Sequence, residues 1–498
     1  MEACPTQLNV LKEILQIFAS SSGLRVNYNK SILLPINLSQ DKLDQLSDLF
    51  GCQKGSFPFT YPGIPLGTCQ PRIEDLLPLV QRVERRLICT SNFLSQAGKL
   101  EMVNTVLTST VMFHSCILKL HKGIIKQINR YRKHCLWHGS DINSNKPPKA
   151  AWAMVCLPKR EGGLGVINLS THNDALCLKF LHKFFNRADI PWVHLVWENY
   201  YSNGSLPGQQ KRCSFWWRDV VKLLDQFKGI AHVNIGDGFP VLFWLDLWNG
   251  NVFEHVYPEL RSFPRNPGIS FSQFTATSLL DNFNLPLSVP AHQQLLEVIT
   301  SVQNLERVEG TDQWTYIWGS GNFSANRTYK ALIDHQTVHP ALLWTWKNKC
   351  QMKHKVFFWL LLKDRLSTKD LLQRKNMALD SVTCEMCILQ RRETVSHLFL
   401  KCNFARACWE SIGITFIRTR SPFQIFSSIK RQLQVPFAME IIIIMSWSIW
   451  ISRNNWTFKN IGPSVQDSRD YFFKEFQLTT LRARSDLVDD MLSWLNSI

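Results

Sequence analysis

Several common signatures are missing from this chain of 498 residues, and each absence narrows its function. No H-E-x-x-H or G-x-S-x-G motif occurs, so the familiar metalloprotease and hydrolase sites are not indicated. The most apolar run, residues 441–451, is too short to span a bilayer, and it predicts a buried helix. The 14 cysteines show no disulfide framework, and no secretory signal opens the sequence. We therefore expect free thiols in a reducing, intracellular compartment, and no membrane partner.

Acidic residues are also scarce relative to basic ones, which leaves a net charge of +17. Residues 72–160 hold 15 Lys and Arg against 5 Asp and Glu, a net charge of +10. Residues 346–406 hold 13 against 5, a net charge of +8. Two separate basic segments indicate a polyanionic partner, RNA or DNA, bound through non-specific phosphate contacts. The alternative is that these are solvated helix faces that happen to be basic.

One stretch carries the clearest chemistry. Cys384, Cys387, His397 and Cys402 follow the spacing C-x2-C-x9-H-x4-C, and Cys384 and Cys387 form the only C-x-x-C pair in the chain. Zinc in structural sites takes four thiolate and imidazole ligands, which closes every position. We expect a helix or helix end to return His397 and Cys402 to the same ion. The alternatives are a redox pair or a chance cluster of buried thiols. The spacing favours a structural zinc ion without a catalytic role.

Hydrophobic periodicity predicts the first elements of the chain. Residues 8–20 have helical spacing, residues 24–28 alternate like a strand, and residues 61–67 are a turn-rich loop or short hairpin. Three amphipathic helices with basic outer faces follow, the first starting at Pro78 and the second capped by Ser95. The third spans the region of Ile124 to Leu136, and residues 143–149 read as a linker. These helices predict a small basic bundle.

Residues 190–330 are rich in tryptophan. We expect most of these rings to lie in a core, although exposed rings could stack on bases. Gly162, Gly163 and Gly165 predict a tight turn before a helix, in preference to a phosphate cradle. The Gly-Asp-Gly sequence at 236–238 predicts a hairpin, and residues 321–324 a strand start or helix cap. Residues 436–458 and 467–498 each predict one helix, with Trp409 and Ile412 packing on the zinc motif. The fold class is α+β, mainly helical.

In order, these motifs resemble the C-terminal part of a plant LINE-type (non-LTR) retrotransposon reverse transcriptase. The matching segments are residues 22–31, 61–67, 94–99, 159–175, 236–248, 321–324, the four zinc ligands and residues 447–454. Pro62 replaces the Leu usual in the second segment, and Lys99 stands in the Arg position of the thumb signature L-S-x-A-G-R. The resemblance covers nearly the whole chain.

The resemblance implies a domain order. Residues 1–70 would be a palm-end and primer-grip-like remnant, 71–142 a helical thumb, and 143–340 a linker with a Trp-rich connecting region. Residues 341–420 would form the zinc-binding domain and 421–498 a C-terminal helical region. Candidate phosphate-binding residues are Arg82, Arg85, Arg86, Lys99, Lys126 and Arg130 in the thumb, and Lys353, Lys355, Arg391, Arg392 and Lys401 near the zinc site.

The catalytic aspartates of that family would lie upstream of residue 1. We therefore expect a truncated, reverse-transcriptase-like protein that does not polymerise DNA, since two-metal catalysis needs those carboxylates. Nuclear localisation follows from the resemblance alone. Two alternatives stay open: a protein-interaction scaffold built on the Trp-rich and zinc modules, and a retroelement remnant without function.

Overall fold

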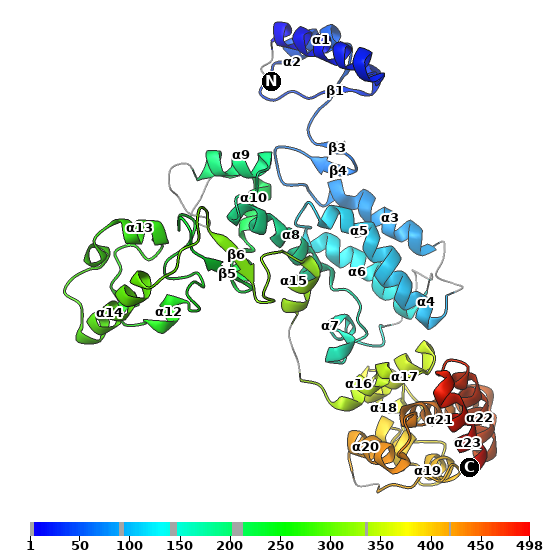
Figure 1. Cartoon of the computed structure of the whole chain (residues 1–498). Coiled ribbons are helices and arrows are strands. Elements are labelled where there is room, and N and C mark those ends of the chain that lie inside the picture. The colour runs from blue at the N-terminus through cyan, green and yellow to red at the C-terminus, as the bar shows by residue number, and fades with distance from the viewer. Residues whose placement is uncertain (1–3, 89–93, 140–146, 202–212, 334–336, 418–419) are drawn as a thin grey trace.

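The computed structural model describes residues 4–88, 94–139, 147–201, 213–333, 337–417 and 420–498. Figure 1 shows a mainly helical molecule with its N-terminal helices at one end and its C-terminal helices at the other, while the Trp-rich region extends to one side. The strands in these residues form three two-stranded sheets. Buried apolar side chains gather in two large cores and one small one. The mainly helical α+β class is therefore confirmed.

The N-terminal unit contains helices α1 (Pro5–Ser22) and α2 (Gln40–Phe50). Strand β1 (Ile32–Leu33) pairs in parallel with β2 (Gln53–Lys54), and the core is small, with Leu8, Leu46 and Phe50 at its centre. The predicted helix at 8–20 is confirmed. The predicted strand at 24–28 is wrong, because the Asn27 side chain accepts the Lys30 N–H at 3.2 Å and starts a 3-10 turn, η1 (Tyr28–Lys30).

The turn-rich segment is the expected hairpin. Strand β3 (Phe59–Tyr61) pairs antiparallel with β4 (Ile64–Leu66). The Gly63 carbonyl oxygen lies 3.0 Å from Nε2 of His114, and Ile64 is buried. The hairpin is thereby attached to the helical bundle that follows it.

The bundle contains α3 (Leu77–Ile88), α4 (Gln96–Glu101), α5 (Thr108–Ser115) and α6 (Lys122–Trp137), preceded by the 3-10 turn η2 (Glu74–Leu76). Ser95 caps α4 as predicted, since its hydroxyl accepts the Gly98 N–H. A π-helical turn, η3 (Met102–Leu107), joins α4 to α5. The predicted linker at 143–149 lies mostly outside the described residues.

The Gly-rich segment forms the predicted tight turn. It follows α7 (Trp152–Cys156) and the 3-10 turn η4 (Lys159–Glu161), and it precedes α8 (Leu169–Phe185). Gly163 has no room for a side chain, because a Cβ there would lie 2.0 Å from the Leu157 carbonyl oxygen. The close approach of the Leu157 backbone therefore requires a glycine at position 163.

The Trp-rich region forms the second core, in which Trp217, Trp244, Trp248 and Trp314 are fully buried, as expected of core residues. Its further helices are α9 (Pro191–Tyr200), α10 (Phe215–Val221), α11 (Leu224–Lys228), α12 (Phe253–Val256), η5 (Leu260–Ser262), α13 (Phe271–Ala276), η6 (Leu279–Asn282), α14 (Val289–Gln303) and α15 (Ala325–Ala331). Ser324 caps α15, which confirms the helix-cap alternative for residues 321–324.

The predicted hairpin at the Gly-Asp-Gly sequence is wrong. Strand β5 (Ala231–Asn234) pairs antiparallel with the distant β6 (Gln313–Tyr316). The reason lies in the buried Asp312, whose Oδ1 accepts the N–H groups of Gly236 at 2.8 Å and Gly238 at 2.9 Å. These bonds fix the glycine turn beside β6.

The zinc-motif region and the C-terminal helices share the first core with the bundle. Their elements are α16 (Pro340–Lys347), α17 (Met352–Leu362), α18 (Lys369–Arg374), the π-helical turn η7 (His397–Lys401), α19 (Asn403–Glu410), α20 (Pro422–Leu433), α21 (Ala438–Lys459), α22 (Val465–Thr480) and α23 (Ser485–Ser497). The predicted apolar helix exists, but α21 continues to Lys459. The single helix predicted at 467–498 is wrong, because α22 and α23 are separated by a turn.

Candidate zinc centre and basic surfaces

The first two cysteines of the motif lie on a loop held by a short backbone ladder. The Cys384 N–H donates to the Arg391 carbonyl at 2.7 Å, and the Glu393 N–H donates to the Val382 carbonyl at 2.9 Å. These bonds fold the chain back on itself between the two ends of the loop. The loop therefore presents Cys384 and Cys387 on one side.

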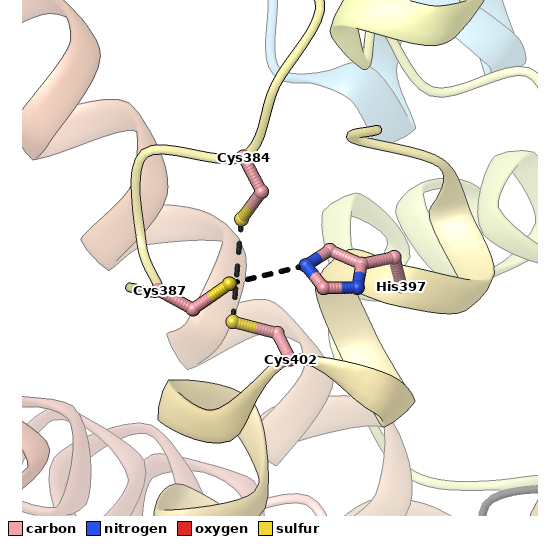
Figure 2. Close-up of side chains that lie close together, drawn as sticks. All are labelled: Cys384, Cys387, His397 and Cys402. Atoms are coloured by element: carbon pink, nitrogen blue, oxygen red, sulfur yellow. Dashed lines mark hydrogen bonds between the residues drawn. The ribbon is translucent and has the colours of Figure 1, made fainter. Parts of the chain in front are cut away.

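The other two side chains come from helical turns, as the sequence predicts. His397 begins η7, and the Thr394 hydroxyl accepts its N–H at 3.1 Å. Cys402 ends η7 and precedes α19, with its N–H donating to the His397 carbonyl at 2.7 Å. Figure 2 shows all four side chains pointing toward one centre.

The spacing of the four side chains fits a tetrahedral zinc ion. Their ligand atoms all lie within 4.8 Å of one another. The sulfurs of Cys384 and Cys402 are 4.0 Å apart, and the Cys387 sulfur is 3.4 Å from Nε2 of His397. Zn–S bonds of about 2.3 Å and Zn–N bonds of about 2.0 Å place two sulfurs about 3.8 Å apart, and a sulfur and a nitrogen about 3.5 Å apart. In the described part of the chain this is the one cluster of three or more His, Cys, Asp or Glu side chains close enough to hold a metal.

The chemistry of the cluster also suits zinc. The hydrogen bond from Cys384 lowers the pKa of Cys402, and the same bond raises the pKa of Cys384. The thiolate, not the thiol, is the metal ligand. Cys384, His397 and Cys402 are buried, and three thiols with one imidazole fill four positions. Such a closed site stabilises a fold and offers no position to a substrate.

A buried ion pair, which the sequence analysis did not predict, connects α21 to residues 382–393, the loop that carries Cys384 and Cys387 and is called the zinc loop below. Arg453 donates from Nη2 to Glu393 Oε1 at 2.8 Å and from Nε to Oε2 at 3.3 Å. Glu393 Oε1 also accepts the Lys369 N–H at 2.9 Å. The hydrophobic wall beside the site includes Trp409, whose indole N–H donates to the Phe399 carbonyl at 3.0 Å. The expected packing of Trp409 on the zinc motif is confirmed. A lone Glu and a lone Arg 60 residues apart carry no sequence signal of pairing.

The structure places the predicted basic residues near the zinc site in different surroundings. Lys355 donates to the backbone carbonyls of Trp346 and Asn348, so its ammonium group stabilises the local structure through these hydrogen bonds. Lys353 pairs with Glu475 at 3.1 Å, and Arg392 pairs with Asp370. Arg391 is exposed, and Lys401, which directly precedes Cys402 in the sequence, is half-buried. Arg391 and Lys401 are thus the better placed of this group to meet a phosphate.

The predicted residues of the bundle are mostly exposed. Arg82, Arg85 and Arg86 line a groove of about 780 Å3 between α3 and the α4–η3 segment. Arg86 also donates to the Thr110 hydroxyl at 2.6 Å. Lys126 and Arg130 lie one turn apart on the exposed side of α6, and Lys99 is half-buried on α4. The basic outer faces predicted for these helices are present.

Comparison with known proteins agrees with the zinc motif. Residues 323–409 match the sequence model of the family described as zinc-binding in reverse transcriptase. These residues, which include the four side chains of the zinc motif, are thus similar to a zinc-binding domain of reverse transcriptases. It is 22% identical over 465 residues to an Arabidopsis thaliana protein named putative ribonuclease H protein, and the match covers 84% of this chain and 71% of that protein. It is 28% identical over 115 residues to an uncharacterized mitochondrial protein of Arabidopsis thaliana, covering 22% of this chain and 75% of that protein.

In the described ranges, no helix is both long and apolar enough to cross a bilayer. Helix α21, which holds the apolar run 441–451, contains the buried Glu440, whose carboxylate accepts the Lys349 N–H at 2.7 Å.

Proposed function

We propose that this chain is a nucleic-acid-binding protein of LINE-type, non-LTR retrotransposon origin in plants, held together in part by one structural zinc ion. Cys384, Cys387, His397 and Cys402 would bind the ion. The observation that carries the proposal is the convergence of these four side chains at tetrahedral spacing, inside a region that matches a zinc-binding domain of reverse transcriptases.

The basic surfaces support nucleic acid as the partner. Arg82, Arg85, Lys126 and Arg130 are exposed on the bundle, and Arg391 is exposed beside the zinc loop. None of these five side chains forms an ion pair with another described residue, so their charge is available to a polyanion. Such binding would be non-specific in sequence and would weaken with salt.

The expectation that the chain does not polymerise DNA by itself stays a prediction. Primer extension by the purified chain would refute it. Nuclear localisation is part of the same proposal and rests on the resemblance alone.

The experiment is a salt titration of binding to an RNA–DNA hybrid, measured by fluorescence anisotropy. Each phosphate contact contributes a slope of about −0.9 in the plot of log affinity against log salt. With about five contacts, raising salt from about 50 to 200 mM should lower affinity by roughly 10² to 10³ fold. Lys126→Gln/Arg130→Gln removes two of these contacts, so the magnitude of the slope should fall by about 1.8.

The zinc requirement is tested with Cys384→Ser/Cys387→Ser, beside Cys69→Ser, which changes an exposed cysteine outside the cluster. Zinc content is measured for the unaltered chain and for both variants. The first variant should lose zinc and affinity, and the second should keep both. Affinity that does not change with salt would contradict the proposal. Nuclease-resistant capture of proteins, without nucleic-acid affinity, would favour the scaffold alternative.

A further inference from the structure

A pocket of about 210 Å3 lies between the helical bundle and the zinc-motif region. Its aromatic lining is Trp137, the last residue of α6, Phe357 of α17, and Trp447 and Trp450 of α21. Its charged lining is Lys149, Lys353 and Arg365. No carboxylate is found among the described residues that line it. Three indole rings and three cations therefore surround one cavity formed by two distant parts of the sequence.

The two parts are firmly joined next to this pocket. Helices α4 and α17 pack against each other, and the indole N–H of Trp359 donates to the Gly162 carbonyl at 2.8 Å. Both sides belong to one continuous hydrophobic core. The pocket walls are thus held in fixed positions, which lowers the entropy cost of binding a ligand.

The indole rings of α21 contact neighbouring aromatic side chains. Trp447 meets Phe357, which itself lines the pocket, edge-on with ring centroids 5.0 Å apart, and Trp450 stacks on Phe399 at 6.2 Å. The buried indole N–H of Trp137 has no hydrogen-bond acceptor in the described structure. Fixed aromatic rings of this kind are stacking platforms for nucleobases.

The cations are only partly neutralised. Lys353 is paired with Glu475, whereas Lys149 and Arg365 form no ion pair with any described residue. A cleft lined by one sign of charge focuses the field and attracts the opposite sign, which here is an anion.

We propose that this pocket binds one unstacked base of a single-stranded nucleic acid, with the adjacent phosphates on Lys149 and Arg365. The inference deepens the proposed function, on which it rests, by assigning single strands to a site of their own. The cavity is smaller than the roughly 300–1,000 Å3 of pockets for drug-sized ligands, so it suits a single ring. A base inside a duplex is stacked on both sides and would have to leave the stack to enter.

The test compares a single-stranded 12-mer with a 12-base-pair duplex, each prepared as RNA and as DNA. Lys149→Gln/Arg365→Gln should weaken binding of the single strand at least about tenfold, since two charge-assisted contacts to phosphates are lost. Duplex binding should change much less. The matched control, Arg82→Gln/Lys126→Gln, removes two cations from the bundle surface and should weaken both ligands together. A zinc content equal to that of the unaltered chain verifies folding of each variant.

A second measurement does not depend on the variants. A 12-mer carrying 4-thiouridine should cross-link under ultraviolet light to peptides that contain Trp137 or residues 447–450. An equal loss of single-strand and duplex binding in the pocket variant, or cross-links only elsewhere, would overturn the pocket assignment while leaving the proposed function intact. An unaltered chain that binds neither ligand would overturn both.

Discussion

The buried pair of Glu393 and Arg453 connects the zinc loop to α21, and replacing Arg453 with Met should reveal how much that connection contributes. The side chains are only 2% and 4% exposed. Removing one partner of a buried ion pair costs about 3–5 kcal/mol, because a charge is left buried without compensation. Glu393 would still accept the hydrogen bond from the Lys369 N–H. We therefore expect a loss at the lower end of this range, about 3 kcal/mol. At about 2–4 °C per kcal/mol, the Tm of this region should fall by about 6–12 °C.

The assay is urea unfolding followed by zinc release to a chromogenic chelator, which reports the zinc region and not the whole chain. Arg484→Met is the matched control, because Arg484 pairs with Asp486 at the surface and its side chain is 72% exposed. An exposed pair contributes about 0–1 kcal/mol, so this variant should release zinc at nearly the unaltered urea concentration. Glu393→Gln/Arg453→Met should recover part of the loss, since no buried charge remains.

The result that would refute the reasoning is an Arg453→Met protein within about 1 kcal/mol of the unaltered chain, or one no less stable than Arg484→Met. Either outcome would mean that the pair does not hold the loop to α21. A double variant less stable than the single one would show that Glu393 stabilises the region by other contacts.

Three further predictions concern other parts of the fold. Gly163→Ala should destabilise the chain by about 1–3 kcal/mol in thermal unfolding, because its Cβ would meet the Leu157 carbonyl oxygen, while Gly462→Ala, with open space around it, should be near neutral. Burial raises the pKa of Asp312 to about 6, above the roughly 3.9 of an unfolded chain, so the stability of the Trp-rich region should fall as pH rises from about 4 to 6. Asp312→Asn should abolish this dependence of the free energy of unfolding on pH. An unchanged dependence would mean that another titrating group causes it. Trp359→Phe, which removes the bond to the Gly-rich turn, should cost about 1–2 kcal/mol and speed hydrogen exchange there; equal exchange would show that the bond contributes little.

The convergence of Cys384, Cys387, His397 and Cys402 could be predicted from sequence because metal chemistry restricts both residue type and spacing. Cys384 and Cys387 are close in the chain, and a helical turn returns Cys402 toward the other three side chains after His397. The residues that hold the site could not be predicted in this way. Glu393 and Arg453 meet only after folding, and each alone resembles a surface residue.

Two of the wrong predictions have a common physical origin, because side-chain hydrogen bonds override the local sequence pattern. The alternating residues 24–28 looked like a strand, but the Asn27 side chain favours a 3-10 turn. The Gly236–Gly238 turn looked like a hairpin, but Asp312 binds its N–H groups from a distant position. Both cases involve a polar side chain that satisfies backbone donors, and neither is visible in hydrophobic periodicity.

The break between α22 and α23 has a different cause. No Gly or Pro lies between Thr480 and Ser485, so the sequence shows no helix stop. The N–H groups of Arg482 and Ala483 donate to the carbonyls of Thr479 and Thr480, which closes a turn in place of another helical step. The turn lets α23 fold back on α22, where Met491 and Leu495 become buried. Tertiary burial, not local propensity, ends the helix.

X-ray absorption at the zinc edge of the purified chain tests the central claim most directly. The account predicts one zinc per chain, with three sulfurs at about 2.3 Å and one nitrogen at about 2.0–2.1 Å. A protein without bound metal, or a zinc ion surrounded by oxygen atoms, would contradict the assignment of Cys384, Cys387, His397 and Cys402 as its ligands.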